Sequence, residues 1–206
     1  MSQVQIIPGS FNITDPSWPK VKILQTVTSD TFSQRAALIG SQTDCHLGGS
    51  PREWTGDANG VDIQDGALLT SQTSASRKAK LEALPADVKF AFTIVSVDST
   101  GGAVTISFRS SADGQERVRL LLRPDQGIIL EEYTGGSATN QHPFIANAFA
   151  AGDRIELVAK GPQLTLLVNG TQTATHTVAR VAAGDLVISS YPIARIPLDD
   201  LVITEA

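Results

Sequence analysis

The sequence contains very little of several residue types whose presence would point to particular classes of protein. Cysteine occurs once in 206 residues, at Cys45, which excludes an internal disulfide and a zinc site built from cysteines. Basic residues do not predominate either, because 16 lysines and arginines stand against 21 aspartates and glutamates, for a net charge of −5. This balance argues against a nucleic-acid partner that is held by bulk positive charge.

Signals for membrane insertion, secretion and helices are equally scarce. No apolar run approaches the roughly 18 residues that cross a membrane, so we expect no membrane insertion. The N-terminus has neither a basic region nor an apolar stretch, so we expect no secretion signal and synthesis in a cytoplasm. The best helical segment, residues 76–84, is short and stops before Pro85, and it predicts a single helix-like turn at most.

Alternation of apolar and polar residues, which is typical of half-buried strands, fills most of the remaining chain. Residues 89–97, 103–110 and 116–123 all show it. In the second of these segments, apolar side chains occupy one face: Val104, Ile106 and Phe108. Polar side chains of the second and third segments occupy the opposite face: Thr105, Ser107, Arg109, Arg117 and Arg119. The pattern predicts antiparallel strands with one buried face.

Turn signals separate these segments and indicate the fold class. Asn169-Gly170 favours a two-residue hairpin turn, because both central positions of a type I′ turn need positive φ angles. Strands recur at roughly 10–15 residues without intervening helices, which predicts an all-β sandwich or barrel. We expect roughly eleven to thirteen strands, and a sheet that wide favours two packed antiparallel sheets.

Residues 1–19 differ in composition from the rest of the chain. Pro8, Pro16 and Pro19 each interrupt β-ladder hydrogen bonding. We therefore expect an extended N-terminal arm over residues 1–19 and a β-sandwich over residues 20–206, although an edge strand of the same sandwich explains the first segment equally well. Apolar side chains of the arm are candidates for contact with a second subunit in a homo-oligomer: Val4, Ile6, Ile7, Phe11 and Trp18.

Several short motifs follow one another along roughly residues 28–206. The first half of the chain contains Asp30-Thr31-Phe32, Trp54 and Asp65-Gly66-Ala67-Leu68-Leu69. The second half contains a pair of adjacent strand motifs, Gly152-Asp153-Arg154-Ile155-Glu156-Leu157 and Leu164-Thr165-Leu166-Leu167-Val168-Asn169-Gly170. Two further motifs follow, Gly184-Asp185-Leu186-Val187-Ile188 and Leu198-Asp199-Asp200-Leu201-Val202-Ile203. In this order they resemble the concanavalin A-like lectin/glucanase superfamily, in its laminin-G-like branch. The resemblance implies an all-β, two-sheet antiparallel jelly-roll β-sandwich. It also implies a phage virion protein, because single-domain members without a secretion signal often look like tail, fibre or capsid-surface proteins.

The glucanases of this superfamily carry their catalytic carboxylates on one strand, as Glu-x-Asp-x-Glu or Glu-x-Asp-x-x-Glu. The present sequence contains no such string. Glu131 and Glu132 are adjacent, and adjacent strand residues point to opposite faces. Cys45 and His46 are neighbours in a loop, where a thiol and its base are rarely posed for catalysis. We therefore expect no catalytic residues and no enzymatic activity.

Acidic residues leave one cofactor alternative open. Calcium needs several oxygen ligands, and laminin-G-like domains often hold one calcium at the rim of the sandwich. The acidic candidates are Asp199 with Asp200, and Asp57 with Asp62 and Asp65. Neither set matches a defined calcium loop, and aspartates are common in turns. We expect no metal site, with calcium as the alternative.

Aromatic residues make up only 5% of the chain, so few rings are available as platforms for a sugar. We expect Trp54 to fill the core between the sheets and Tyr133 to be exposed beside a polar loop, residues 137–142. The basic residues of the polar face can contact an acidic glycan or a partner's carboxylates, and an ordinary solvated face explains them as well. The ligand-binding candidates are Tyr133, Arg109, Arg117, Arg119 and His142.

Together with the resemblance, these features favour a non-enzymatic, phage-type virion surface protein that acts in attachment. It would be a tail or fibre appendage or a capsid decoration subunit at the virion surface. Its expected partners are other virion subunits and a host surface glycan. The alternative is a stand-alone bacterial carbohydrate-binding module or a carbohydrate-active, glucanase-like protein. A soluble monomer with affinity for sugar would favour this alternative.

Overall fold

The computed structural model describes residues 25–32, 38–45, 49–56, 61–64, 67–70, 77–97, 102–145, 149–190 and 196–206. Within these ranges the chain forms fifteen β-strands. None of the described segments is a helix long and apolar enough to cross a membrane. The strands are β1 (Thr26–Asp30), β2 (Thr55–Gly56), β3 (Val61–Gln64), β4 (Ala67–Thr70), β5 (Arg77–Leu84), β6 (Val88–Ile94), β7 (Val104–Ser110), β8 (Arg117–Arg123), β9 (Gly127–Thr134), β10 (Ser137–Ile145), β11 (Arg154–Lys160), β12 (Gln163–Val168), β13 (Thr171–Thr177), β14 (Gly184–Ser190) and β15 (Leu198–Glu205).

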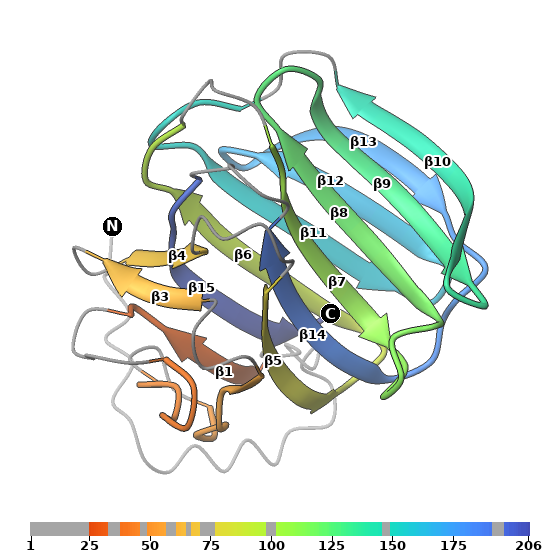
Figure 1. Cartoon of the computed structure of the whole chain (residues 1–206). Coiled ribbons are helices and arrows are strands. Elements are labelled where there is room, and N and C mark those ends of the chain that lie inside the picture. The colour runs from red at the N-terminus through yellow and green to blue at the C-terminus, as the bar shows by residue number, and fades with distance from the viewer. Residues whose placement is uncertain are drawn as a thin grey trace, which may run out of the picture.

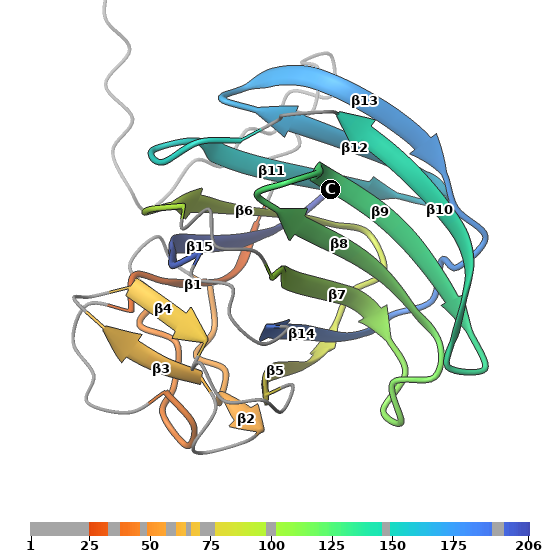
Figure 2. The ribbon, with the colours of Figure 1, turned by 45° about the horizontal axis from the view of Figure 1, so that its top comes forward.

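The strands form two sheets that stack face to face (Figures 1 and 2). The eight-stranded sheet has the order β13-β12-β11-β6-β15-β4-β3, with β1 also paired to β15. The seven-stranded sheet has the order β10-β9-β8-β7-β14-β5-β2. Every pairing is antiparallel. The predicted all-β, two-sheet sandwich is confirmed.

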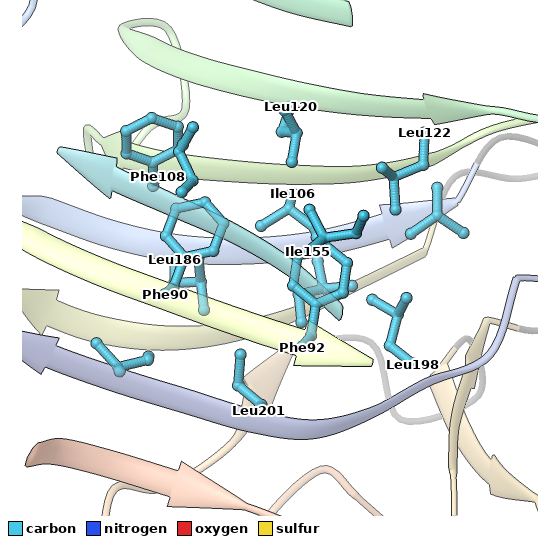
Figure 3. Packing of buried hydrophobic residues seen from close by; sticks show 14 of the residues in the cluster. Phe90, Phe92, Ile106, Phe108, Leu120, Leu122, Ile155, Leu186, Leu198 and Leu201 are labelled. Atoms are coloured by element: carbon cyan, nitrogen blue, oxygen red, sulfur yellow. The ribbon is translucent and has the colours of Figure 1, made fainter. Parts of the chain in front are cut away.

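Apolar side chains from both sheets fill the space between the layers (Figure 3). Phe90 of β6 lies with its ring centroid 5.2 Å from that of Phe108 of β7, at an interplanar angle of 60°. Such tilted aromatic pairs contribute beyond the burial of their area. The alternation predicted for residues 103–110 therefore places its apolar face, with Ile106 and Phe108, in the core. The following side chains join it from other strands: Phe92, Leu120, Leu122, Ile155, Leu186, Leu198 and Leu201.

Trp54 is fully buried, with 0% of its surface exposed, as expected for a residue that fills the core. Its indole Nε1 donates a hydrogen bond of 2.7 Å to Oδ2 of Asp30. The backbone N–H of Phe32 donates to the other oxygen, Oδ1, at 3.0 Å. The buried Asp30 carboxylate therefore ties the tryptophan to the end of β1, and this contact gives a physical reason for the Asp-x-Phe and Trp motifs.

The Asn169-Gly170 hairpin is confirmed between β12 and β13. Asn169 has a φ angle of 51° and Gly170 a φ angle of 75°, which are the left-handed conformations that this turn needs. The Asn169 side chain also accepts a hydrogen bond from the Arg154 N–H at 2.9 Å and donates one to Asp153 Oδ1 at 2.7 Å. The turn thus clamps the start of β11, which explains why the Gly-Asp and Asn-Gly motifs occur together.

Two segments differ from the sequence prediction. Residues 76–84 were expected to form at most a helix-like turn, yet Arg77–Leu84 is strand β5, paired along its length with β14. Ala79 and Leu81 are buried at 0% exposure, so tertiary pairing outweighs the helical preference of lysine, alanine and leucine. The expected polar loop over residues 137–142 is likewise part of a strand, β10, because it pairs with β9.

Residues 1–19, with Val4, Ile6, Ile7, Phe11 and Trp18, lie outside the described residues, so the arm and its contacts stay predictions.

Candidate functional site

The outward face of the seven-stranded sheet is hollowed into a groove of about 440 Å³. This volume falls within the roughly 300–1,000 Å³ that is usual for small-ligand sites. The groove crosses the strands from β5 to β8 and is bounded by the β7–β8 and β9–β10 turns. Most of its lining side chains are polar or charged: Lys78, Lys80, Thr105, Ser107, Asp113, Arg117, Arg119, Asp185 and Ser189.

The strand register arranges these side chains in rows across the sheet. Directly paired residues in adjacent antiparallel strands share one face and lie close together. One row runs through Lys80, Val187, Ser107, Arg119, Glu131 and Gln141. The next row runs through Lys78, Ser189, Thr105, Leu121 and Ile129. The floor therefore combines hydroxyl groups with cations, and the Thr105 and Ser189 hydroxyls lie 2.5 Å apart.

Glu131 holds Arg119 in place on this floor. The Arg119 guanidinium donates from Nε to Glu131 Oε2 at 2.7 Å, and its Nη2 donates to the same oxygen. Gln141 Nε2 donates to the other carboxylate oxygen at 2.6 Å. Both partners are largely buried, and charge-assisted hydrogen bonds of this kind are the strong ones. Both carboxylate oxygens of Glu131 are therefore occupied, and Glu131 holds the Arg119 side chain in place.

Tyr133 lies beside the two arginines of β8 that line the groove, and it is half-buried, whereas an exposed position was expected from the sequence. The guanidinium carbon of Arg117 lies 3.8 Å from the centroid of the tyrosine ring, and that of Arg119 lies 4.6 Å away. These distances are typical of cation–π contacts. On the β10 side, the residue paired with Tyr133 is Ala138, which is exposed and has a small side chain. Three of the five predicted ligand-binding residues therefore come together here.

Arg109 does not join this face, although the alternation predicted that it would. The β7–β14 register shifts beside it, and Arg109 has a φ angle of 50°, so its side chain leaves the polar row. The buried guanidinium donates to three backbone carbonyls, those of Ala86 at 2.9 Å, Arg180 at 2.7 Å and Gly161 at 2.8 Å. Burial lowers the pKa of Arg109 from its usual value. This residue clamps three connections at one end of the sandwich.

His142 also lies away from the groove, at the edge where β10 of one sheet meets β13 of the other. Its ring centroid is 4.8 Å from that of His176 on β13, and its Nε2 is 3.7 Å from Glu132 Oε1. Burial, together with the neighbouring His142, lowers the pKa of His176. No local pattern of residues predicts this pair, because the two residues belong to different sheets.

Asp199 and Asp200, a predicted calcium candidate, form a bulge in β15. The register between β15 and β6 shifts after Asp199, Asp200 has a φ angle of 50°, and its N–H donates to Asp199 Oδ1 at 2.7 Å. Among the residues that the structure describes, no cluster of three or more histidine, cysteine or acidic side chains could hold a metal ion. The second candidate set lies outside the described side chains: Asp57, Asp62 and Asp65.

Acidic side chains are sparse on the hollowed face. Each described strand of the seven-stranded sheet carries at most one outward acid, and these are Glu82 on β5, Asp185 on β14 and Glu131 on β9. Asp185 accepts a hydrogen bond from the Ala83 N–H at 3.1 Å and lies 3.6 Å from the Lys80 ammonium nitrogen. The outward acids thus belong to different strands, and Asp185 and Glu131 have partners within the fold.

Comparisons with known proteins identify the fold. No protein-family model matches the sequence, and no curated protein matches it. A transglycosylase, Crh5 in complex with NAG, superposes with a TM-score of 0.61 at 12% identity, covering 86% of this chain and 82% of that one. The β-glucanase of Bacillus licheniformis gives 0.58 at 11% identity, covering 86% and 97%. The carbohydrate-binding module CBM66 of Bacillus subtilis gives 0.56 at 11% identity, covering 82% and 94%. The chain therefore has the concanavalin A-like jelly-roll fold.

Proposed function

We propose that this protein binds carbohydrate in the groove on its seven-stranded sheet and does not cleave it. The observation that carries the proposal is the composition of the groove. Hydroxyl groups on its floor can exchange hydrogen bonds with sugar hydroxyls, and guanidinium groups can donate to them. Tyr133, whose ring contacts both groove arginines, adds an amphipathic ring beside the groove against which the apolar face of a sugar can pack. The names of the similar structures, a binding module, a glucanase and a transglycosylase, support the same ligand class.

The arrangement of acids supports binding over cleavage. Glycoside hydrolysis needs two carboxyl groups flanking the bond, about 5–5.5 Å apart for retention and roughly 6.5–9.5 Å apart for inversion. Both oxygens of Glu131 accept hydrogen bonds from neighbouring side chains, Arg119 and Gln141. Asp185 is held by Lys80 and by the backbone of Ala83. Neither acid is placed as a proton donor or a nucleophile for a bound sugar.

Replacing Tyr133 with alanine is expected to weaken glycan binding at least about tenfold, which corresponds to roughly 1.4 kcal/mol. The change removes the ring and also the surface on which Arg117 lies. A glycan array followed by calorimetry with the strongest ligand measures the effect. Tyr133→Phe is the matched control, since it keeps the ring and removes only the hydroxyl, and it should bind nearly as well as the parent. Unchanged binding by Tyr133→Ala would place the site elsewhere, and release of new reducing ends would reveal cleavage.

The setting that we propose for this binding is the surface of a phage-type particle. The composition of residues 1–19 supports it, because an extended, proline-rich segment is suited to docking on a neighbouring subunit. Deleting residues 1–19 should leave the β-sheet circular dichroism unchanged and convert an oligomer into a monomer in light scattering. A monomer both with and without the segment would instead favour a stand-alone carbohydrate-binding module. Loss of the folded state would show that the segment belongs to the sandwich.

A further inference from the structure

Positive charge gathers in the groove although the chain as a whole is acidic. The net charge of the protein is −5. Four cationic side chains line the groove, against two acidic ones, Asp113 and Asp185. The cations are Lys78, Lys80, Arg117 and Arg119. A cationic side chain in the groove that is not paired with a carboxylate attracts anionic ligands and disfavours cationic ones.

Two of these cations are already neutralised within the fold. Lys80 lies 2.7 Å from a carboxylate oxygen of Glu82 and 3.6 Å from one of Asp185. The hydrogen bond to Glu82 raises the pKa of Lys80. Arg119 is paired with Glu131, as described above. The charge of each of these side chains is therefore already balanced by a carboxylate of the fold.

Arg117 is different, because no carboxylate lies within ion-pair distance of it in the part of the chain that the structure describes. The half-buried guanidinium is held by the Tyr133 ring, 3.8 Å from its central carbon, and by a hydrogen bond from Nη1 to the Gly114 carbonyl. A guanidinium has five N–H donors in a rigid plane, and such a fork matches a carboxylate with two parallel hydrogen bonds. Arg117 is therefore an ordered cation in the groove that has no anionic partner among the described residues.

We propose that the groove selects an acidic saccharide, whose carboxylate group binds Arg117 and whose hydroxyl groups lie along the floor. This inference rests on the proposed carbohydrate-binding function. The Thr105, Ser107 and Ser189 hydroxyls offer neutral partners beside the charged one. From β8 to β5 the groove crosses three strand intervals, about 14 Å at the usual strand spacing, so a short oligosaccharide fits it better than a single sugar.

An acidic peptide is the competing ligand, and the position of the groove disfavours it. Extended peptides commonly bind by adding a strand to an open sheet edge, where unpaired backbone groups give affinity. The groove lies on the face of the sheet, and the ladders on both sides of β7, β8 and β14 are occupied by neighbouring strands. The groups that it presents are side chains, which suit the many hydroxyls of a saccharide.

Calorimetry with charged and uncharged forms of the same sugars tests the proposal. The probes are tetrasaccharides of galacturonate, of glucuronate and of mannuronate, each as the free acid and as the methyl ester, which keeps the ring and removes the charge. At least one acid should bind at least tenfold more tightly than its ester. Arg117→Gln should weaken binding of the acid at least tenfold and weaken binding of the ester much less, so that the preference for the acid is lost. Arg117→Lys, which keeps the charge and loses the planar fork, should recover only part of the preference.

Lys160→Gln is the matched control, because it removes one positive charge from the exposed outward face of the eight-stranded sheet. It should leave the preference for the acid unchanged. Equal binding of acid and ester, or binding of neutral glycans alone, would overturn the inference while the proposed carbohydrate-binding function stands. Failure to bind any glycan would overturn both the selectivity for acidic saccharides and the proposed carbohydrate-binding function. Binding of polyglutamate in place of the sugars, lost in Arg117→Gln, would identify an acidic peptide as the ligand and would also overturn the proposal.

Discussion

Replacing Arg109 with methionine is expected to lower the free energy of unfolding by about 3–5 kcal/mol. The guanidinium donates to the carbonyls of Ala86, Arg180 and Gly161, which belong to three different connections between strands. Methionine fills much of the same volume but donates no hydrogen bond. These hydrogen bonds are partly buried, and each carbonyl that loses its donor without gaining a water costs roughly 1–3 kcal/mol. Urea denaturation measures the change directly.

Arg123→Met provides the control for this prediction. Arg123 forms an ion pair with Asp125 at 2.8 Å, and both side chains are substantially exposed. Exposed pairs of this kind contribute about 0–1 kcal/mol, so the control should barely change the free energy of unfolding. A cost below about 1 kcal/mol for Arg109→Met would mean that water replaces the lost donors, and that Arg109 is not a clamp.

The second large effect is expected at Trp54. Trp54→Ala should lower the free energy of unfolding by about 3–5 kcal/mol, because it opens a cavity at a fully buried site. Trp54→Phe keeps most of the packing against Phe32 but removes the Nε1 donor to Asp30. Because hydrogen bonds to charged groups contribute about 1.5–3 kcal/mol, this milder change should still cost about 2–3 kcal/mol.

A double-mutant cycle separates the hydrogen bond from the packing. Asp30→Asn can still accept one hydrogen bond but no longer presents two acceptor oxygens to Trp54 and Phe32. If the indole–carboxylate contact stabilises the fold, Trp54→Phe and Asp30→Asn should be coupled by at least about 1 kcal/mol. Additive effects of the two substitutions would show that the burial of the tryptophan, and not its hydrogen bond, accounts for the loss.

Local patterns predicted those parts of the fold that local chemistry determines. The alternation in β7 and β8 placed Val104, Ile106 and Phe108 in the core, and the Asn169-Gly170 dipeptide marked its hairpin. The prediction for residues 76–84 was wrong because their structure depends on distant parts of the chain. Their composition suits a helix, and only pairing with β14, about a hundred residues later in the chain, makes them a strand. Long-range pairing of this kind leaves no mark within a short window of sequence.

In the candidate site, too, local patterns predicted the contacts between consecutive strands and missed those that depend on irregular register or distant pairing. Arg117, Arg119 and Tyr133 come together because β8 and β9 are consecutive strands whose register places Arg117 opposite Tyr133. Arg109 is separated from them by a local break in the register of β7, which a regular alternation cannot reveal. His142 was assigned to a loop and instead belongs to a strand at the edge of the sandwich. The contribution of Lys78 and Lys80 to the groove was missed because their segment was not recognised as a strand.

The central claim is that the groove on the seven-stranded sheet is the carbohydrate-binding surface. NMR titration of the labelled protein with the oligosaccharide that binds most tightly on a glycan array tests it most directly. We expect the largest amide shift changes on β7, β8 and β14, around Ser107, Arg117 and Ser189. Shift changes that gather instead on the outward face of β11, β12 and β13, or the absence of any change at saturating ligand, would contradict it.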